Sequence, residues 1–331
     1  MVYRVAVTGA SGYIGSRLLA RLKSDPDVEA IVAIDHTPLP SEPDGEVRFH
    51  QRDINEPLED LFRENGVNAV VHLAFVLRPG HNRAAIERTN VAGTSNLLHA
   101  SSRAGVATIV YLSSTTVYGA RPDNPPLLTE EHPLRPQREF QYAWDKTQVE
   151  AMLQGYGHTH PQARVVVLRS CVVMGQGAEN FITRALSKPF LVAVKGYDPP
   201  MQFLYQDDLT ELMALALKEK AIHGAFNVAG DGAVPYSEMV ALSGRRLLRL
   251  PASVLYPFLQ ATWNLRIQGD SPSVGLDFIR YPWVADTARV RRETGYRFRY
   301  TSREALMAYL GSGGRGMAKG RKEEGRRYGR S

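Results

Sequence analysis

Residues 4–15 read RVAVTGASGYIG, and this stretch decides the fold. A short apolar run ends at Thr8, three glycines follow at Gly9, Gly12 and Gly15, and a helical pattern continues to residue 23. Glycines at this spacing let the backbone turn tightly, let a pyrophosphate approach the main-chain amides, and let the helix pack close to the strand. The stretch therefore predicts a strand, a turn and a helix that bind a dinucleotide, with a purely structural turn as the alternative.

The next predicted strand ends in an acidic residue, Asp35, which lies 20 residues after Gly15. A carboxylate at this place accepts hydrogen bonds from the adenosine ribose and repels a 2′-phosphate. The residues that follow, His36, Thr37 and Pro38, include no arginine that would pair with such a phosphate. These residues favour NAD over NADP as the cofactor.

Outward from this unit, short apolar runs alternate with longer amphipathic stretches as far as about residue 170. This alternation predicts an α/β fold with a doubly wound parallel sheet, because continuously apolar strands are typical of a sheet buried on both faces. The predicted strands are 4–8, 30–34, 47–50, 69–73, 108–112 and 164–168, and the predicted helices are 12–23, 58–65, 83–104 and 141–156.

The later part of the chain is less regular and predicts a second, smaller domain. We expect residues 1–174 to form the cofactor domain, with 202–228 returning to it, and residues 175–201 and 229–310 to form a mostly helical substrate domain. Residues 311–331 hold seven glycines and little to bury, so a disordered basic tail is expected there.

The composition excludes several classes of protein. The 331 residues carry a formal net charge of +6, but the last 21 contain seven Lys or Arg against two Glu, which leaves the rest nearly neutral. A nucleic-acid partner is therefore not expected. One cysteine, Cys171, rules out an intrachain disulfide and a cysteine-rich metal site, which favours the cytoplasm.

Stable membrane insertion is not expected either. The N-terminus lacks the long apolar stretch of a signal peptide, and no apolar run reaches the ~18 residues of a spanning helix. The most apolar late segment, residues 247–265, is interrupted by Arg249, Pro251, Pro257 and Asn264, so it is expected on a surface or lining a pocket.

Further motifs follow the glycine-rich turn in order: Arg52-Asp53-Ile54, Val71-His72-Leu73-Ala74, a helix starting Asn90-Val91-x-Gly93-Thr94, and Leu112-Ser113-Ser114-x-x-Val117-Tyr118-Gly119. Over about residues 3–310 the chain resembles the extended branch of the short-chain dehydrogenase/reductase superfamily, and within it the NAD-dependent epimerase/dehydratase family. The resemblance implies a Rossmann-type fold and NAD contacts from Gly9, Ser11, Gly12, Tyr13, Ile14, Gly15, Asp35, Asp53, Ile54, Leu73, Ala74, Asn90, Tyr142 and Lys146.

A phenol and an ammonium group lie four residues apart in Tyr142-Ala143-Trp144-Asp145-Lys146, so both project from one face of a predicted helix. A tyrosine has a pKa of ~10, and lowering it toward ~7 takes about 4 kcal/mol of preferential phenolate stabilisation, which nearby positive charge supplies. We expect Tyr142 to take a proton from a substrate hydroxyl, Lys146 to bind the nicotinamide ribose as well, and Ser114 to orient the reacting oxygen. The alternative is a Tyr–Lys pair that only decorates a helix surface.

Two departures from the family pattern bear on the substrate. Sugar-nucleotide members resemble this chain at Arg169 but carry an asparagine where Val172 stands, and an arginine where Met201-Gln202-Phe203 stands. Without that guanidinium, the substrate diphosphate has no bidentate partner unless Arg266 or Arg280 provides one.

Three functions therefore stay open. The first is NAD-dependent hydride transfer at a secondary hydroxyl of a sugar nucleotide. The second is the same chemistry on a hydrophobic alcohol or ketone, steroid-like or isoprenoid, which the many large apolar residues after residue 250 would suit. The third is a non-catalytic NAD-binding subunit. A small-molecule substrate is the expected partner, and a homodimer is compatible with the sequence.

Other polar residues are interpreted structurally. Asp207 and Asp208 open a predicted helix, where carboxylates are favoured by the helix dipole, so no metal site is predicted. His72 is expected to be a structural strand-end residue or a neighbour of the cofactor, not an acid or base, and Cys171 a small core residue. Arg169 suits a structural or a substrate role equally.

Overall fold

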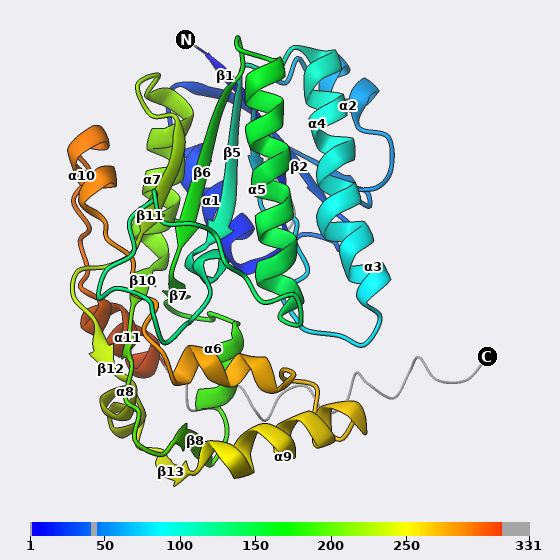
Figure 1. The fold of residues 1–331 in the computed structure, drawn as a ribbon. Helices are drawn as coiled ribbons and strands as arrows, with labels where there is room; N and C mark the ends of the chain where they lie inside the picture. Colours follow the sequence, from blue (N-terminus) through cyan, green and yellow to red (C-terminus); the bar gives the residue numbers. More distant parts are fainter. Residues whose placement is uncertain (1, 41–44, 313–331) are drawn as a thin grey trace.

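The computed structural model describes residues 2–40 and 45–312, and its centre is a seven-stranded parallel sheet with the order β11-β6-β5-β4-β1-β2-β3 (Figure 1). The sequence predicted this doubly wound α/β fold, and the structure confirms it. The strands are β1 (Tyr3–Thr8), β2 (Val28–Asp35), β3 (Val47–Gln51), β4 (Ala69–His72), β5 (Thr108–Ser114), β6 (Arg164–Ser170) and β11 (Gly224–Val228).

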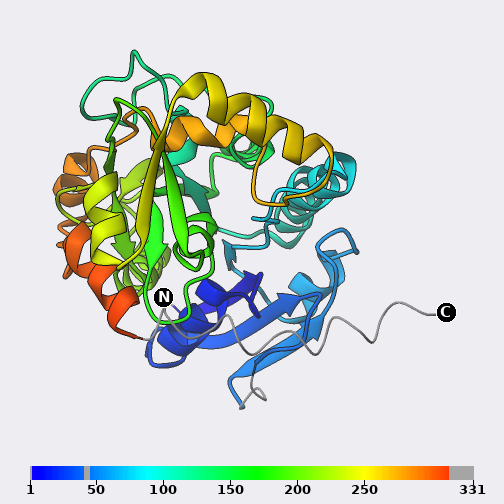
Figure 2. The ribbon, with the colours of Figure 1, turned by 90° about the horizontal axis from the view of Figure 1, so that it is seen from below.

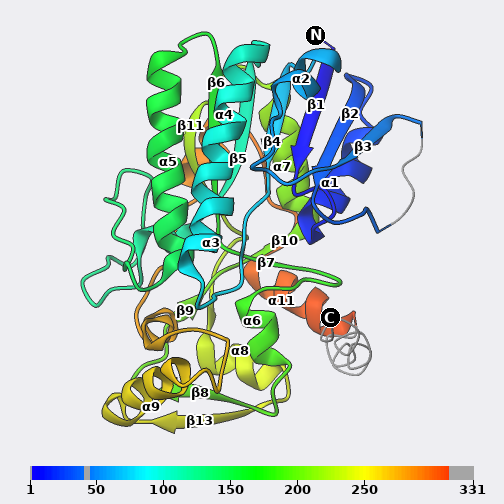
Figure 3. The ribbon, with the colours of Figure 1, turned by 90° about the vertical axis from the view of Figure 1, so that its right-hand side faces the viewer.

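Helices cover both faces of the sheet (Figure 3). One face packs on α1 (Tyr13–Lys23) and α7 (Gln206–Lys218), and the other on α2 (Glu59–Glu64), α4 (Gly93–Ala104) and α5 (Gln141–Thr159). The predicted helix 83–104 is divided, because a π-helical turn at Arg88–Ala92 separates α3 (Arg83–Glu87) from α4. Odd and even residues of β1, such as Val5 and Ala6, enter opposite cores, which explains why the strands read as continuously apolar.

A second group of elements lies beyond the carboxyl ends of the sheet strands (Figure 1). It contains α6 (Phe181–Leu186), β8 (Phe190–Val194), β9 (Pro200–Met201), β12 (Val234–Pro235), α8 (Tyr236–Leu242), β13 (Arg246–Leu250), α9 (Ala252–Asn264) and the 3-10 turn Ser273–Ile279. Two short strands, β7 (Val172–Met174) and β10 (Phe203–Tyr205), pair in parallel between the two groups.

The last helices return toward the sheet. In α10 (Ala288–Thr294), Val290 joins the apolar core that includes Phe226 of β11, although it belongs to the segment expected to form the substrate domain. In α11 (Ser302–Gly311), the side chains of Thr301 and Glu304 form a capping box at the start of the helix. The domain boundaries stay a prediction, and the expected tail lies outside the described residues from 313 onward.

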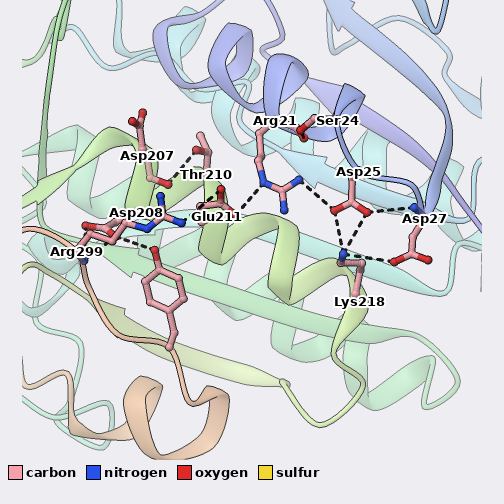
Figure 4. A network of polar contacts seen from close by, with 11 residues as sticks. Arg21, Ser24, Asp25, Asp27, Asp207, Asp208, Thr210, Glu211, Lys218 and Arg299 are labelled. Atoms are coloured by element: carbon pink, nitrogen blue, oxygen red, sulfur yellow. Dashed lines mark hydrogen bonds and ion pairs between the residues drawn. The ribbon is translucent and has the colours of Figure 1, made fainter.

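Charged side chains join α1 to α7 on one face of the sheet (Figure 4). Arg21 of α1 donates to Glu211 of α7 at 2.8 Å and to Asp25 at 3.1 Å. Lys218, at the end of α7, completes the link with a 2.9 Å bond to the buried Asp25 carboxylate. These bonds fix the two helices relative to each other.

Asp208 makes structural hydrogen bonds, as expected from its position at the start of a helix. Its carboxylate is fully buried and lies beside Arg299 (Figure 4). It accepts hydrogen bonds from the Tyr296 hydroxyl at 2.7 Å and from the backbone amides of Arg299 and Tyr300. Asp208 therefore anchors the segment that leads from α10 to α11.

No helix among residues 2–40 and 45–312 is long and apolar enough to cross a bilayer.

Candidate active site

A cavity of about 460 Å³ opens between the carboxyl ends of the central strands and the second group of elements. It brings together every residue predicted for the site except Asn90. Its wall includes Gly9, Ser11, Gly12, Tyr13, Ile14, Gly15, Asp35, Asp53, Ile54, Leu73, Ala74, Ser114, Tyr142 and Lys146.

The glycine-rich turn forms one end of the cavity, and two of its glycines have no room for a side chain. Gly9 has a φ of 71°, and a Cβ there would lie 2.7 Å from the Ala74 nitrogen. A Cβ on Gly15 would lie 2.1 Å from the Gly9 carbonyl oxygen. The first turn of α1 has no acidic residue and its N-cap, Gly12, provides no capping side chain, so the helix start suits an anionic phosphate.

Asp35 lies at the end of β2 with its carboxylate held by the chain. Oδ2 accepts from the Ser11 amide at 3.0 Å, and Oδ1 accepts from the Thr37 amide and hydroxyl, both at 3.0 Å. His36 Nδ1 also lies 3.2 Å from Oδ1. A carboxylate can accept about four hydrogen bonds, and Oδ2 accepts only from Ser11 among the described residues, so Oδ2 keeps capacity for a ribose hydroxyl. The turn and Asp35 together therefore fit an adenine dinucleotide.

A buried chain of hydrogen bonds supports the strand ends beneath the cavity. The Thr8 hydroxyl lies 2.7 Å from His72 Nδ1, and His72 Nε2 lies 2.9 Å from the Thr94 hydroxyl. Burial lowers the pKa of His72 to about 3, with a smaller contribution from Lys146, so the ring is neutral. His72 is therefore a structural residue, as the sequence suggested.

Tyr142 and Ser114 meet on the cavity wall. Tyr142 projects from the first turn of α5, and its ring contacts Phe75 edge to face at 5.7 Å between centroids. Burial raises the pKa of Tyr142 to about 12, while a hydrogen bond with Ser114 acts in the opposite direction. The Ser114 oxygen also accepts bonds from the Thr116 amide and hydroxyl, at 3.2 and 3.0 Å, which orients it.

Lys146 lies one turn further along α5, with Nζ 5.9 Å from the centre of the Tyr142 ring. Its ammonium donates to the Leu112 carbonyl at 2.6 Å and packs over the Phe75 ring at 3.6 Å. Burial holds the pKa of Lys146 well below its ordinary value, partly offset by Glu150 and Asp145. The sequence prediction that Tyr142 and Lys146 share a face is confirmed.

Asn90 lies behind the cavity wall rather than in it. It is fully buried in the π-helical turn, accepts a 2.7 Å bond from the Val76 amide and donates a 2.9 Å bond to Asp145. Asn90 is not among the residues that line the cavity, and its contact with NAD stays a prediction. Its side chain ties α5 to the loop after β4, which does line the cavity.

Arg169 and Gln202 are committed to structural bonds. Arg169 is buried, with a 2.7 Å ion pair to Glu150 and a 2.8 Å bond to the Tyr118 hydroxyl, and it does not line the cavity. Gln202 exchanges two hydrogen bonds with the backbone of Ala285. Met201 is fully buried in the apolar core, so neither position serves as an anion contact.

An arginine that the sequence analysis missed, Arg184 of α6, lines the cavity, whereas neither Arg266 nor Arg280 does. Its guanidinium is half-buried and makes no hydrogen bond or ion pair with the part of the chain that the structure describes. Burial lowers the pKa of Arg184, the nearby Arg78 guanidinium lowers it further, and the carboxylates of Asp270 and Glu179 partly offset both effects. The only sequence signal was its place four residues after the helix-capping Asn180.

The chain matches a known family model over residues 5–229, that of the NAD dependent epimerase/dehydratase family. It belongs to this family. It is accordingly an NAD-dependent enzyme of the extended short-chain dehydrogenase/reductase type, as the motifs predicted.

Relatives and solved structures agree with this membership. An uncharacterized protein of Mycobacterium tuberculosis is 30% identical over 326 residues, which cover 95% of this chain and 84% of the relative. UDP-glucose 4-epimerase of Azospirillum brasilense is 28% identical over 321 residues, covering 88% of this chain and 86% of the relative. The structure of MoeE5 in complex with UDP-glucuronic acid and NAD superposes with a TM-score of 0.74 at 25% identity, covering 93% and 98% of the two chains.

Proposed function

We propose that this family member catalyses hydride transfer at a secondary hydroxyl of a sugar nucleotide. The observation that carries the proposal is the meeting of Tyr142, Ser114 and Lys146 in one cavity with the glycine-rich turn. A Tyr–Lys pair that only decorated a helix surface would face solvent, whereas Lys146 is buried beside the cavity.

NAD would lie along the cavity from Asp35 to Tyr142. The amides at the start of α1 would bind the pyrophosphate, the Asp35 carboxylate the adenosine ribose, and Lys146 the nicotinamide ribose. Bound NAD supplies a ring that accepts the hydride from the substrate carbon and can return it. Asp53 and Ile54, at the cavity wall near Asp35, are proposed to contact the adenine.

The chain's own residues handle the proton. Ser114 would donate a hydrogen bond to the reacting oxygen and hold it near the Tyr142 hydroxyl. Tyr142 would accept the proton of the substrate hydroxyl, which requires the phenolate form that burial disfavours. The phenolate therefore needs a positive charge beside it when substrate and NAD bind. The buried Lys146 lies close to the Tyr142 ring and would supply that charge.

Arg184 is proposed to bind the anionic part of the substrate. Arg184 lines the cavity and makes no side-chain hydrogen bond or ion pair with residues 2–40 and 45–312, although the carboxylates of Glu179 and Asp270 lie near it. A guanidinium there would bind phosphate oxygens, which Met201 and Gln202 are not placed to do. The epimerase relative and the UDP-glucuronic acid complex of MoeE5 support a nucleotide sugar as the ligand class.

One observation favours the second candidate, a hydrophobic alcohol or ketone. The substrate end of the cavity is lined by the aromatic residues Phe140, Phe181, Phe278 and Trp283. These rings would suit a lipophilic substrate, although aromatic rings also pack on sugar faces and on a uracil base.

The test is to incubate the purified protein with NAD and each of UDP-glucose, UDP-galactose and UDP-glucuronic acid, and to follow products by NMR. We expect conversion of at least one sugar, and Tyr142→Phe should lower turnover at least ~10²-fold while NAD affinity is kept. Lys146→Met should impair both turnover and NAD binding. NAD binding without any turnover, or NADH-dependent reduction of an apolar ketone alone, would overturn the proposal.

A separate variant tests the role of Arg184. Arg184→Met should weaken binding of UDP by about tenfold or more, because it removes a charge-assisted bidentate partner of the phosphates, and should leave NAD affinity unchanged. Arg266→Met, an arginine outside the cavity, is the matched control and should change neither affinity. Equal UDP affinity in the two variants would exclude Arg184 from substrate binding.

A further inference from the structure

Helix α9 carries apolar side chains that are buried and others that residues 2–40 and 45–312 leave exposed. Leu255 and Leu259 pack inward with Val194 and Leu276. Val254 and Phe258 precede these leucines by one position, about 100° away around the helix, and are 52% and 62% exposed. An apolar stripe on a helix ordinarily packs against a partner, and no part of the described chain covers this one.

Exposed apolar side chains continue past the C-terminal end of α9. Leu265 is 70% exposed, and Arg266 has a left-handed φ of 57° where glycine is usual. The amides of Arg266 and Ile267 bond to the carbonyls of Trp263 and Thr262, which closes the helix with a Schellman motif. In that motif the residue after the left-handed one usually packs back on the helix, but Ile267 is instead 72% exposed.

The neighbouring ribbon extends the same surface. Strand β13 precedes α9 and pairs with β8, and all three lie at the lower end of the molecule, where α9 crosses the near side in Figure 2. Seven of the twelve exposed large apolar side chains of the described residues lie on β8, β13, α9 and the turn after α9, which together we call the α9–β13 face: Phe190, Leu248, Leu250, Val254, Phe258, Leu265 and Ile267.

The charged side chains on this face are arginines, and the exposed Asp270 that follows it pairs with Lys188. Residues 239–269 contain four arginines and no Asp or Glu. Of the four, Arg246, Arg249 and Arg266 are exposed, while Arg245 bonds to the Leu186 carbonyl. A partner that fits this face has an apolar interior to receive the exposed apolar side chains. It also has negative charge at its surface to pair with the arginines.

We propose that the α9–β13 face docks onto the surface of an anionic lipid bilayer. The apolar side chains would enter the boundary of the acyl region while Arg246, Arg249 and Arg266 meet lipid phosphates. A second copy of the chain fits less well, because a two-fold interface centred on this face would bring its arginines against one another. Asp270 and Ser271 follow the face directly and line the cavity, so docking would hold the cavity close to the lipid.

The experiment uses the full chain and vesicles of phosphatidylcholine alone or with about 30% phosphatidylglycerol, with binding measured by flotation. We expect binding to the anionic vesicles that falls as salt rises. Phe258→Ser combined with Leu265→Ser should lower partitioning by about tenfold or more, because two large apolar side chains no longer enter the lipid. Leu127→Ser, which changes a side chain that is 51% exposed and belongs to another surface, is the matched control and should leave binding unchanged.

The basic residues after 312 remain in every variant, so they cannot account for a difference between variants. Arg246→Gln with Arg249→Gln tests the charge and should also weaken anionic binding. Melting temperature and NAD affinity check that each variant is folded. Absence of vesicle binding, binding that the α9 variants leave unchanged, or a loss of dimer in the α9 variants without lipid binding would each overturn the proposal.

Discussion

Asp145 is a buried carboxyl group that stands directly before Lys146 on α5. It accepts a hydrogen bond from Asn90 at 2.9 Å, with Gln141, Arg83 and Glu87 as its other charged or polar neighbours. Burial raises the pKa of Asp145 to about 6, and the hydrogen bond from Asn90 offsets only part of that rise. The folded state is therefore less stable at pH values where the Asp145 carboxyl group is ionised.

The sign of the resulting pH dependence is opposite to that of an ion-paired aspartate. Between about pH 4, where an unfolded aspartate titrates, and about pH 6, the folded chain holds a proton that the unfolded chain releases. The free energy of unfolding should thus fall as pH rises through this window. Asp145→Asn removes the ionisation, and its stability relative to the parent should rise from near zero at pH 4 to about 2 kcal/mol at pH 7.5.

Urea unfolding at the two pH values measures this difference. Asp123→Asn is a useful contrast. Arg135 lowers the pKa of Asp123, so replacing Asp123 should reduce stability above pH 4. Parallel pH profiles for Asp145→Asn and the parent would show that Asp145 is not held in a protonation-sensitive site.

At the scale of elements, two glycines on helices are expected to respond oppositely to alanine. Gly15 lies in the first turn of α1, where a Cβ would meet the carbonyl oxygens of Gly9 at 2.1 Å and Ala10 at 2.7 Å. Gly15→Ala should push α1 away from the glycine-rich turn, lower stability by about 2 kcal/mol or more, and abolish NAD binding.

Gly155 lies within α5 with no atom within 4 Å of its added Cβ. Gly155→Ala should therefore stabilise the protein by about 0.5–1 kcal/mol, because alanine loses less backbone entropy in a helix. Thermal unfolding and NAD titration of both variants make the comparison. A stable, NAD-binding Gly15→Ala variant would contradict the close packing of α1 on β1.

At the scale of the whole molecule, the basic charge and the folded body are expected to be separable. Removal of residues 313–331 takes away seven Lys or Arg and two Glu, so the formal net charge falls from +6 to +1. The removed sequence offers few apolar side chains to a core, and α11 would keep its buried Leu306 and Tyr309. We expect the melting temperature and NAD affinity to stay unchanged while retention on an anionic resin drops.

A chain cut after Thr301 is the control, because loss of α11 would remove those buried side chains and should lower the melting temperature clearly. A marked loss of stability on removing 313–331 alone would mean that this segment packs on the body.

The sequence by itself determined the parts of the protein that depend on short-range spacing. The turn at Gly9, Gly12 and Gly15, the apolar strands, and the Tyr142–Lys146 pair each follow from the period of a strand or helix and from glycine conformation. The same patterns indicated the family, because its motifs stand at strand and helix ends, where local sequence and site coincide.

Only the tertiary structure decided which distant side chains share an environment. In the folded chain, Arg184 lines the cavity and Arg169 forms a buried ion pair with Glu150. Asn90 donates a hydrogen bond to Asp145 behind the cavity wall. Within residues 2–40 and 45–312, the tertiary structure also left Val254 and Phe258 of α9 exposed. The physical reason is that burial and pairing depend on contacts between residues far apart in the chain, and one arginine or one apolar helix carries no local signal of which partner it will meet.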